Sequence, residues 1–303
     1  MLEKQAVNFL VTPHARPNHA ILPLMVRITV LASGSRGNSA LIASSRTRIL
    51  VDAGLSARET VRRMRLCCED PAALTAILIS HEHSDHIAGL RVLARKLKIP
   101  VYMTGATHQA WFRLIRQEAR AAGETARDLE RLEFFEAGRS FNIGDVAVLP
   151  FTIPHDAADP VGFNFHIDGV KIGLVTDLGY MPASVAHHLK KCDGLMIESN
   201  HDLEMLRTGP YPWSVKQRVM SRVGHLSNEA LADFFASHYD GGAAFLILAH
   251  LSEQNNHPEI ARRTAEQALG LRPSLFQHQL ALASQSQPLE PITIESLHDC
   301  VIG

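Results

Sequence analysis

Short apolar runs rich in β-branched residues alternate along this chain with segments that are apolar on one side only. The clearest apolar runs, which predict strands, lie at 25–33, 74–80, 193–199 and 244–252. Segments with apolar residues at helical spacing, which predict helices, lie at 56–66, 87–98, 228–239 and 258–269. Strands and helices are therefore mixed from one end of the chain to the other.

Hairpins interrupt this alternation. Residues 134–152 predict a strand and a hairpin, and residues 161–179 predict a second hairpin with an Asp168-Gly169 turn. Residues 106–131 predict a long helical stretch with a break at Gly123, and 291–296 predict a last edge strand. A Rossmann fold would show regular strand-helix-strand units, so the pattern favours the α+β class.

The chain shows no internal repeat, no low-complexity tract and no linker, which predicts one domain over residues 25–303. Residues 1–24 carry an acid, bases and prolines among apolar residues. This mixture fits neither a signal peptide nor a membrane anchor. We expect a disordered or mis-annotated extension there, with Met25 as the alternative start.

Charge and cysteine content narrow the setting of the protein. The formal net charge of −1 gives no global field toward nucleic acid or membrane, so such a partner must bind a local patch. No apolar run approaches the length of a membrane span. The 4 cysteines form no Cys-x-x-Cys pair, which is typical of a reducing compartment. We therefore predict a cytoplasmic protein without a membrane partner.

The chemistry is concentrated after the predicted strand 74–80, where three histidines and an aspartate fall within six positions. These residues are His81, His83, Asp85 and His86. Imidazole nitrogens suit zinc and similar metals, and a carboxylate adds charge. A polar helix cap is the other interpretation, but it explains the histidines poorly.

Three further residues of metal-binding type directly follow apolar strands: His155, Asp177 and His250. Because strand ends converge in space, these side chains are candidates to complete the cluster. Each taken alone could equally be structural.

The ordered motifs "HEHSDH", His155, "TDLG" and His250 resemble those of the metallo-β-lactamase-fold hydrolases. This resemblance implies a four-layer αβ/βα sandwich of two mixed sheets. It assigns His81, His83 and His155 to one divalent ion, and Asp85, His86 and His250 to a second. Asp177 bridges both ions, which are zinc or manganese, and Asp52 supports the site from behind.

The resemblance also implies a mechanism. Two divalent ions acidify a shared water, giving a bridging hydroxide that attacks the substrate. Asp85 orients this hydroxide or accepts its proton. Such a site suits a phosphodiester, whose charged oxygens replace water on the metals.

Longer motifs narrow the substrate. "ASGSRGNSALI", "ESNHDLEML", "GHLSNE" and "AHLSEQNN" resemble the YycJ/WalJ-type subgroup, whose members are regarded as 5′-to-3′ DNA exonucleases. The resemblance therefore implies a DNA exonuclease. A phosphodiesterase for small or cyclic nucleotides on the same metals is the alternative, and a non-catalytic binding protein with a structural metal is a third interpretation.

Four residues outside the ligand set are further candidates. His225 resembles the histidine with which related phosphodiesterases contact the phosphate or protonate the leaving oxygen. His201 and Asp202 could support the site or face the substrate, and Arg36 with its glycine turn could contact a phosphate. A helix-start histidine and an ordinary hairpin loop are the plainer explanations of His225 and Arg36.

DNA binding needs a positive surface, and the segment from Arg91 to Arg131 holds nine Lys/Arg against four Asp/Glu. Arg113, Arg116 and Arg120 share one helix face beside Trp111 and Phe112. They predict either a track for the DNA backbone with an aromatic stacking partner, or a solvated helix over buried aromatic rings. No separate clamp domain is visible, so binding is weak or shared with a second subunit in a homodimer.

Overall fold

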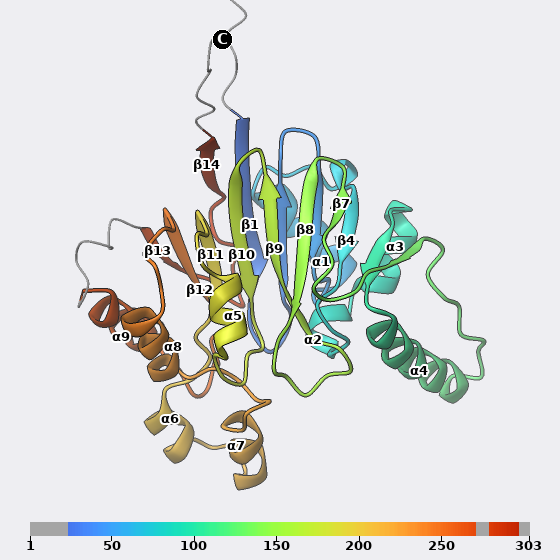
Figure 1. Ribbon diagram of the computed structural model, residues 1–303. Coiled ribbons are helices and arrows are strands. Elements are labelled where there is room, and N and C mark those ends of the chain that lie inside the picture. The colour runs from blue at the N-terminus through green and yellow to red at the C-terminus, as the bar shows by residue number, and fades with distance from the viewer. Residues whose placement is uncertain (1–23, 271–278, 297–303) are drawn as a thin grey trace, which may run out of the picture.

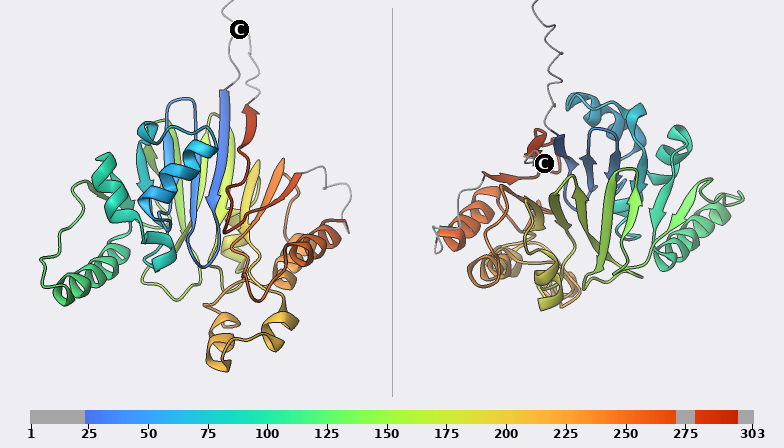
Figure 2. Two further views of the ribbon diagram at one scale, coloured as in Figure 1. Left: turned by 180° about the vertical axis from the view of Figure 1, so that it is seen from behind. Right: turned by 45° about the horizontal axis from the view of Figure 1, so that its top comes forward.

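The computed structural model describes residues 24–270 and 279–296 (Figure 1). Two seven-stranded sheets face each other, and helices cover their outer faces (Figure 2). The predicted four-layer sandwich of two mixed sheets is thereby confirmed. The extension predicted for residues 1–24 lies almost wholly outside the described residues.

The first sheet is built mainly from the N-terminal half of the chain. Its strands are β1 (Leu24–Ala32), β2 (Ser39–Ala43), β3 (Arg48–Val51), β4 (Ala76–Leu78), β5 (Val101–Met103), β6 (Leu132–Phe134) and β14 (Ile292–Ser296). They lie in the order β14-β1-β2-β3-β4-β5-β6, with β3 to β6 parallel. β14 pairs with β1 at the edge, as the sequence predicts.

The second sheet contains the predicted hairpin. Its strands are β7 (Phe141–Ile143), β8 (Val146–Thr152), β9 (Val161–Ile167), β10 (Val170–Val175), β11 (Gly194–Glu198), β12 (Phe245–Ala249) and β13 (Gln279–Leu282). They follow one another in space from β13 to β7. In the β9–β10 turn both Asp168 and Gly169 have positive φ, 48° and 84°, as a tight primed turn requires.

Helices cover both outer faces. Over the first sheet lie α1 (Ala57–Leu66), α3 (Leu90–Leu97) and α4 (Gly105–Ala121), and over the second lie α5 (Ala183–His188), α8 (Asn228–Ser237) and α9 (Pro258–Gly270). The shorter helices are η1 (Pro71–Ala73), α2 (Ser84–Ile87), α6 (Leu203–Thr208) and α7 (Trp213–Val219). Within the described ranges no helix is both long and apolar enough to cross a membrane.

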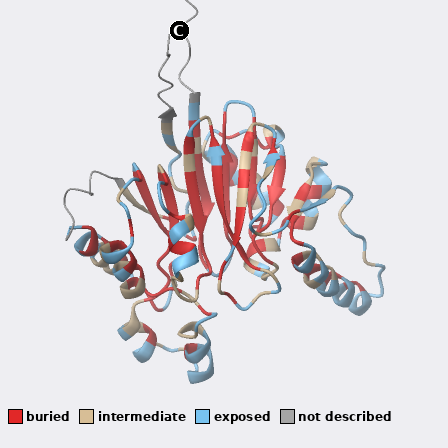
Figure 3. Ribbon diagram, viewed as in Figure 1, coloured by how far each residue is buried: buried red, intermediate tan, exposed pale blue. Residues whose placement is uncertain are grey.

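The strands of both sheets are mostly buried (Figure 3), and their periodicity divides the apolar side chains between layers. Val26, Ile28 and Val30 of β1 point into the core between the two sheets, whereas Leu31 packs under the helices. Each sheet is therefore buried on both faces. This rigid double core holds the strand ends, and the loops that follow them, at fixed positions.

Two helix predictions need correction. The stretch predicted over 106–131 is helical only to Ala121, because Gly123 adopts a φ of +70° and residues 124–131 run without helix. The helix predicted over 87–98 is found as α3 but begins later, at Leu90, because α2 ends at Ile87 and Gly89 is the N-cap of α3. Only glycine fits at position 89, because a Cβ atom there would come within 1.9 Å of the Leu55 carbonyl oxygen.

The two interpretations of α4 are now separable. Trp111 is only 1% exposed and belongs to the core beneath the helix, so it has no face free for stacking on a base. Arg113, Arg116 and Arg120 are exposed on the opposite side. The stacking role considered for Trp111 is therefore wrong, and the helix is a solvated one over a buried aromatic ring.

Candidate metal and phosphodiester site

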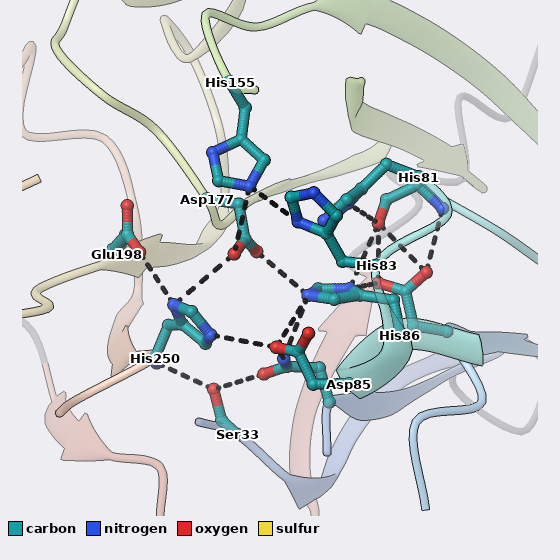
Figure 4. Close-up of polar contacts among 12 residues, drawn as sticks. Ser33, His81, His83, Asp85, His86, His155, Asp177, Glu198 and His250 are labelled. Carbon is teal, nitrogen blue, oxygen red and sulfur yellow. Dashed lines mark hydrogen bonds and ion pairs between the residues drawn. The ribbon is translucent and has the colours of Figure 1, made fainter. Parts of the chain in front are cut away.

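Six strands of the two sheets direct polar residues to one edge of the sandwich. Asp52 follows β3, and the loop after β4 and the start of α2 carry His81, His83, Asp85 and His86. From the second sheet, His155, Asp177 and His250 follow β8, β10 and β12, and Glu198 ends β11. Figure 4 shows His81, His83, Asp85, His86, His155, Asp177 and His250 around a common centre, with Glu198 next to His250.

The chain turns sharply where it leaves three of these strands. Asp52, Asp177 and His250 have φ values of 60°, 59° and 55°, in the left-handed region. Non-glycine residues pay about 1–3 kcal/mol for such a conformation, and it recurs at functional sites. At Asp177 and His250 this turn brings the side chain into the ligand groups, and at Asp52 it brings the carboxylate against His86.

The first group consists of His81, His83 and His155, whose ring nitrogens offer ligand atoms within 4.8 Å of one another. His155 Nε2 lies 3.2 Å from His83 Nδ1. His81 Nε2 is buried and has no hydrogen-bond partner in the described part of the chain. Three imidazole nitrogens converging on one point are typical of a metal site.

The second group consists of Asp85, His86, Asp177 and His250. His86 Nε2 lies 3.2 Å from Asp177 Oδ2, and His250 Nε2 lies 3.5 Å from Asp85 Oδ2. Asp177 Oδ2 and His250 Nε2 are buried without a hydrogen-bond partner among the described residues. Buried polar atoms normally have partners, so these atoms point to a missing ligand.

Asp177 connects the two groups through its two carboxylate oxygens. Oδ2 faces His86 of the second group, and Oδ1 lies 3.8 Å from His155 Nε2 of the first. The side chain is 2% exposed. Asp177 therefore lies between the two groups, with one oxygen facing each of them.

Burial and charge oppose each other at this centre. Burial raises the pKa of the Asp177 carboxyl, but the imidazoles of His250 and His86 outweigh it and hold that pKa well below its usual range. The converse holds for His86, since burial lowers its pKa while Asp177 and Asp52 raise it well above the ordinary value. For His81, burial dominates and keeps the pKa well below normal. The buried carboxylates are therefore ionised, and positive charge within the site stabilises them.

The donor set fits divalent metal ions. Imidazole nitrogens with carboxylate oxygens are the ligands that zinc and its neighbours prefer. Three of the atoms that face the centre, His81 Nε2, Asp177 Oδ2 and His250 Nε2, have no hydrogen-bond partner in the described residues. Cations bound there would pair both the orphaned atoms and the buried carboxylates.

Asp52 holds His86 in place. Its Oδ2 accepts a hydrogen bond from His86 Nδ1 at 2.8 Å, and its Oδ1 accepts from the Ser80 amide at 2.8 Å. With Nδ1 donating, His86 turns Nε2 toward the centre. Carboxylates commonly fix metal-binding histidines in this way.

Glu198 is a site residue that the sequence reasoning missed. Its Oε1 accepts from Nδ1 of both His225 and His250 at 2.8 Å, and its Oε2 accepts from the amides of Leu178 and Leu226. Burial raises the pKa of Glu198, but the two imidazoles lower it to about 2, so the group is a carboxylate. The sequence feature that identifies His250, a polar residue at the end of an apolar strand, could also have identified Glu198.

We expect Glu198→Gln to lower kcat/KM about 10- to 100-fold, the usual effect of losing a group that orients metal ligands. Glutamine keeps the size but has one acceptor oxygen. The glutamine NH₂ group cannot accept a hydrogen bond. Depending on how the side-chain amide is turned, either the two histidines or the two backbone amides therefore lose their acceptor. Steady-state kinetics with a parallel metal titration measure the effect.

Asp202→Asn is the matched control for this change. Asp202 lies four residues further along and its Oδ1 caps α6 by accepting from the Met205 amide at 2.8 Å. Asparagine caps helices equally well, so activity should stay at the wild-type level. Equal activity of Glu198→Gln and wild type would show that Glu198 only fills space.

Of the four other candidates, only His225 lies among the ligand groups. His225 joins the site, since its ring centre lies 5.2 Å from that of His155 and 5.0 Å from that of His250. His201 is 1% exposed and cannot face a substrate, and burial lowers its pKa to about 4. Asp202 serves as the helix cap described above.

Arg36 lies outside the ligand set. Its side chain is 68% exposed and forms an ion pair with Glu253. The glycine turn does not present free amides, because the Gly34, Arg36 and Asn38 N–H groups donate to other groups of the protein. The turn instead braces the site: Asn38 Nδ2 lies 3.1 Å from Asp85 Oδ2, a contact that sequence reasoning did not foresee.

Comparisons with known proteins agree with this geometry. Residues 47–251 match the family model described as "Beta-lactamase superfamily domain". The chain is 40% identical over 244 residues to exodeoxyribonuclease YycJ of Bacillus anthracis, covering 80% of this chain and 89% of that protein. It is 39% identical over 238 residues to exodeoxyribonuclease WalJ of Streptococcus pneumoniae, covering 78% and 86%.

Among solved structures, the metallo-β-lactamase-fold protein YhfI of Bacillus subtilis superposes with a TM-score of 0.64 at 18% identity, covering 88% of this chain and 99% of that one. That likeness concerns the fold, whereas the two sequence relatives match most of the chain. The chain therefore belongs to the metallo-β-lactamase superfamily, in the same family as the YycJ and WalJ exodeoxyribonucleases.

Proposed function

We propose that this protein is a metal-dependent phosphodiesterase that degrades DNA as an exonuclease. The observation that carries the proposal is the pair of ligand groups facing each other across Asp177, with orphaned donor atoms, at the strand ends. Identity of about 40% to two exodeoxyribonucleases over most of the chain supports DNA as the substrate. The 5′-to-3′ direction is part of the proposal.

Two divalent ions, zinc or manganese, are proposed to bind here. His81, His83 and His155 would hold one ion, Asp85, His86 and His250 the other, and Asp177 both. When bound, such ions acidify water at neutral pH and neutralise charge on a phosphate. His86 and His250 need little rearrangement to bind, because their rings are already held by Asp52 and Glu198.

The protein's own groups position the proton transfers. Asp85 has one oxygen near Asn38 and His250, so its carboxylate can orient an attacking water or take its proton. His225 bonds to Glu198 through Nδ1, which leaves Nε2 to donate a proton to the leaving oxygen. Its side chain is 22% exposed, enough to contact a substrate at the rim of the site.

A nuclease panel tests the proposal. Metal-loaded protein is incubated with single- and double-stranded DNA and with RNA, bearing 5′-phosphate or 5′-hydroxyl ends, in zinc and in manganese. We expect DNA to be shortened from the 5′ end, and Asp85→Ala and His86→Ala to lose at least about 10²-fold in rate. Unchanged activity in both variants would contradict the site assignment.

The same panel separates the two alternatives. Turnover of bis-p-nitrophenyl phosphate and cyclic nucleotides with no gain on DNA would indicate a small-molecule phosphodiesterase. About one ion per chain with no hydrolysis would indicate a binding protein with a structural metal. The cytoplasmic location and the homodimer stay predictions.

A further inference from the structure

A small helical segment lies beside the site and has no part in the proposed catalysis. We call residues 203–224 the edge cap; it contains α6, α7 and the loop that leads to His225. Figure 1 shows α6 and α7 projecting beyond the sheets on the side where the strand ends carry the site.

Direct contacts tie the edge cap to the first ligand group. The Gly224 carbonyl accepts from His155 Nδ1 at 3.1 Å, and the Val223 carbonyl accepts from the Asp156 amide at 3.1 Å. Arg218 Nε donates to Asp156 Oδ2 at 2.6 Å, while Asp156 Oδ1 lies 3.5 Å from His155 Nε2. The Arg218 guanidinium is thus one carboxylate away from a proposed metal ligand.

Positive charge is concentrated on the edge cap. The segment holds four basic residues and one acidic residue: Arg207, Lys216, Arg218 and Arg222 against Glu204. Lys216 is buried, where its Nζ binds the Arg207 and Gly209 carbonyls and so holds α6 to α7. The three arginines are exposed. A guanidinium has five N–H donors, so Arg218 can keep Asp156 and still bind a phosphate.

Apolar surface accompanies this charge. Trp213 is 62% exposed, Val215 39% and Val223 43%, so three of the eight exposed large hydrophobic residues found in the described chain lie on the edge cap. The only other tryptophan, Trp111, is 1% exposed. An exposed indole among arginines is a suitable partner for an unpaired base, because every base has a face that stacks.

The arginines of α4 are a weaker candidate for the DNA-binding surface. Arg113, Arg116 and Arg120 are exposed, but within the described ranges none bonds to a site residue, and the tryptophan beneath them is buried. Figure 1 shows α4 at the side of the first sheet. The edge cap has positive charge, an exposed tryptophan ring and hydrogen bonds to the site. Helix α4 has the positive charge, but its tryptophan is buried and its arginines do not contact the site.

We propose that the edge cap binds the single-stranded end of the DNA, with Trp213 stacking on an unpaired base and Arg218 holding a backbone phosphate next to the first ligand group. This inference rests on the proposed function in taking DNA as the substrate. It explains why a Trp is exposed at this position, and why Arg218 is anchored to Asp156.

Tryptophan fluorescence tests the stacking directly, because the chain contains 2 tryptophans and one is buried. A phosphorothioate oligothymidine, which resists cleavage, is titrated into the metal-loaded protein. We expect emission of the wild type to fall, and that of Trp213→Phe to stay constant while anisotropy shows the oligonucleotide still binding. Binding without quenching in the wild type, or no binding at all, would overturn the proposal.

Kinetics on single-stranded DNA supply a second readout. Trp213→Ala should raise KM about 5- to 100-fold, and Trp213→Phe should restore most of the loss. Arg218→Ala should reduce the salt dependence of binding by about one phosphate contact, whereas Arg116→Ala on α4 should change neither quantity. Weaker binding by Arg116→Ala with unchanged binding by Trp213→Ala would refute the assignment.

One parallel assay keeps this proposal separate from the proposed function. Absence of bis-p-nitrophenyl phosphate hydrolysis by the metal-loaded wild type would count against the phosphodiesterase. The emission titration involves no cleavage, so it decides the stacking proposal whatever that result is.

Discussion

Replacing Asp177 by asparagine should reduce phosphodiester hydrolysis about 10³-fold or more, the largest loss expected of any single change in the chain. Asp177 is the carboxylate that reaches both ligand groups, through Oδ2 toward His86 and Oδ1 toward His155. The neutral amide removes one charge and turns one of these two acceptors into a donor. One of the two proposed ions would lose its bridging ligand, and the other would keep a neutral oxygen in place of a charged one.

Asparagine is the right replacement because of the backbone. Asp177 has a φ of 59°, and asparagine is among the few residues that adopt this conformation readily. Asp168→Asn is the matched control, since Asp168 has a φ of 48° in the β9–β10 turn. We expect the control to keep full activity and both variants to unfold near the wild-type temperature. Comparable activity of Asp177→Asn and Asp168→Asn would contradict the bridging role.

Removal of metal should abolish hydrolysis and also lower the melting temperature by about 5 °C or more. The site buries three carboxylates, Asp52, Asp177 and Glu198, and Asp85 beside them is partly exposed. Without cations, only protonated imidazoles balance them. At a free ion concentration about 100 times Kd, a bound ion contributes about 2.7 kcal/mol to the free energy of unfolding.

Chelation followed by reloading measures both effects. Protein treated with a chelator and dialysed is melted and assayed, then reloaded with zinc or with manganese. Both the melting temperature and the hydrolysis should return with one of these ions. Full activity at less than about 0.1 ion per chain would rule out a metal-dependent mechanism.

The sequence contains most of the site but not its supports. His155, Asp177 and His250 could be found because each follows an apolar strand, and strand ends meet in space. Glu198 also lies at the end of an apolar strand, but it is the last residue of the strand itself. From sequence alone, an acidic residue at that position is interpreted as one at the exposed edge of the sheet. Asn38 reaches Asp85 only because a turn from the first sheet folds under the site, a contact between positions 47 residues apart.

Burial is the other quantity that sequence pattern alone does not supply. Trp111 and Trp213 both stand near arginines in helical segments, yet the first is 1% and the second 62% exposed. Which of them faces solvent depends on how α4 and α7 pack against the rest of the fold. Likewise Asp202 and His201 follow a strand as His250 does, but one caps a helix and the other is enclosed.

The number of ions bound per chain tests the central claim most directly. Elemental analysis of loaded, desalted protein should give two ions for the wild type and one for His155→Ala, which removes a ligand of the first group only. His86→Ala should leave the other ion in the same way. A single ion in the wild type, or the same ion content in all three proteins, would contradict a two-metal centre at these strand ends.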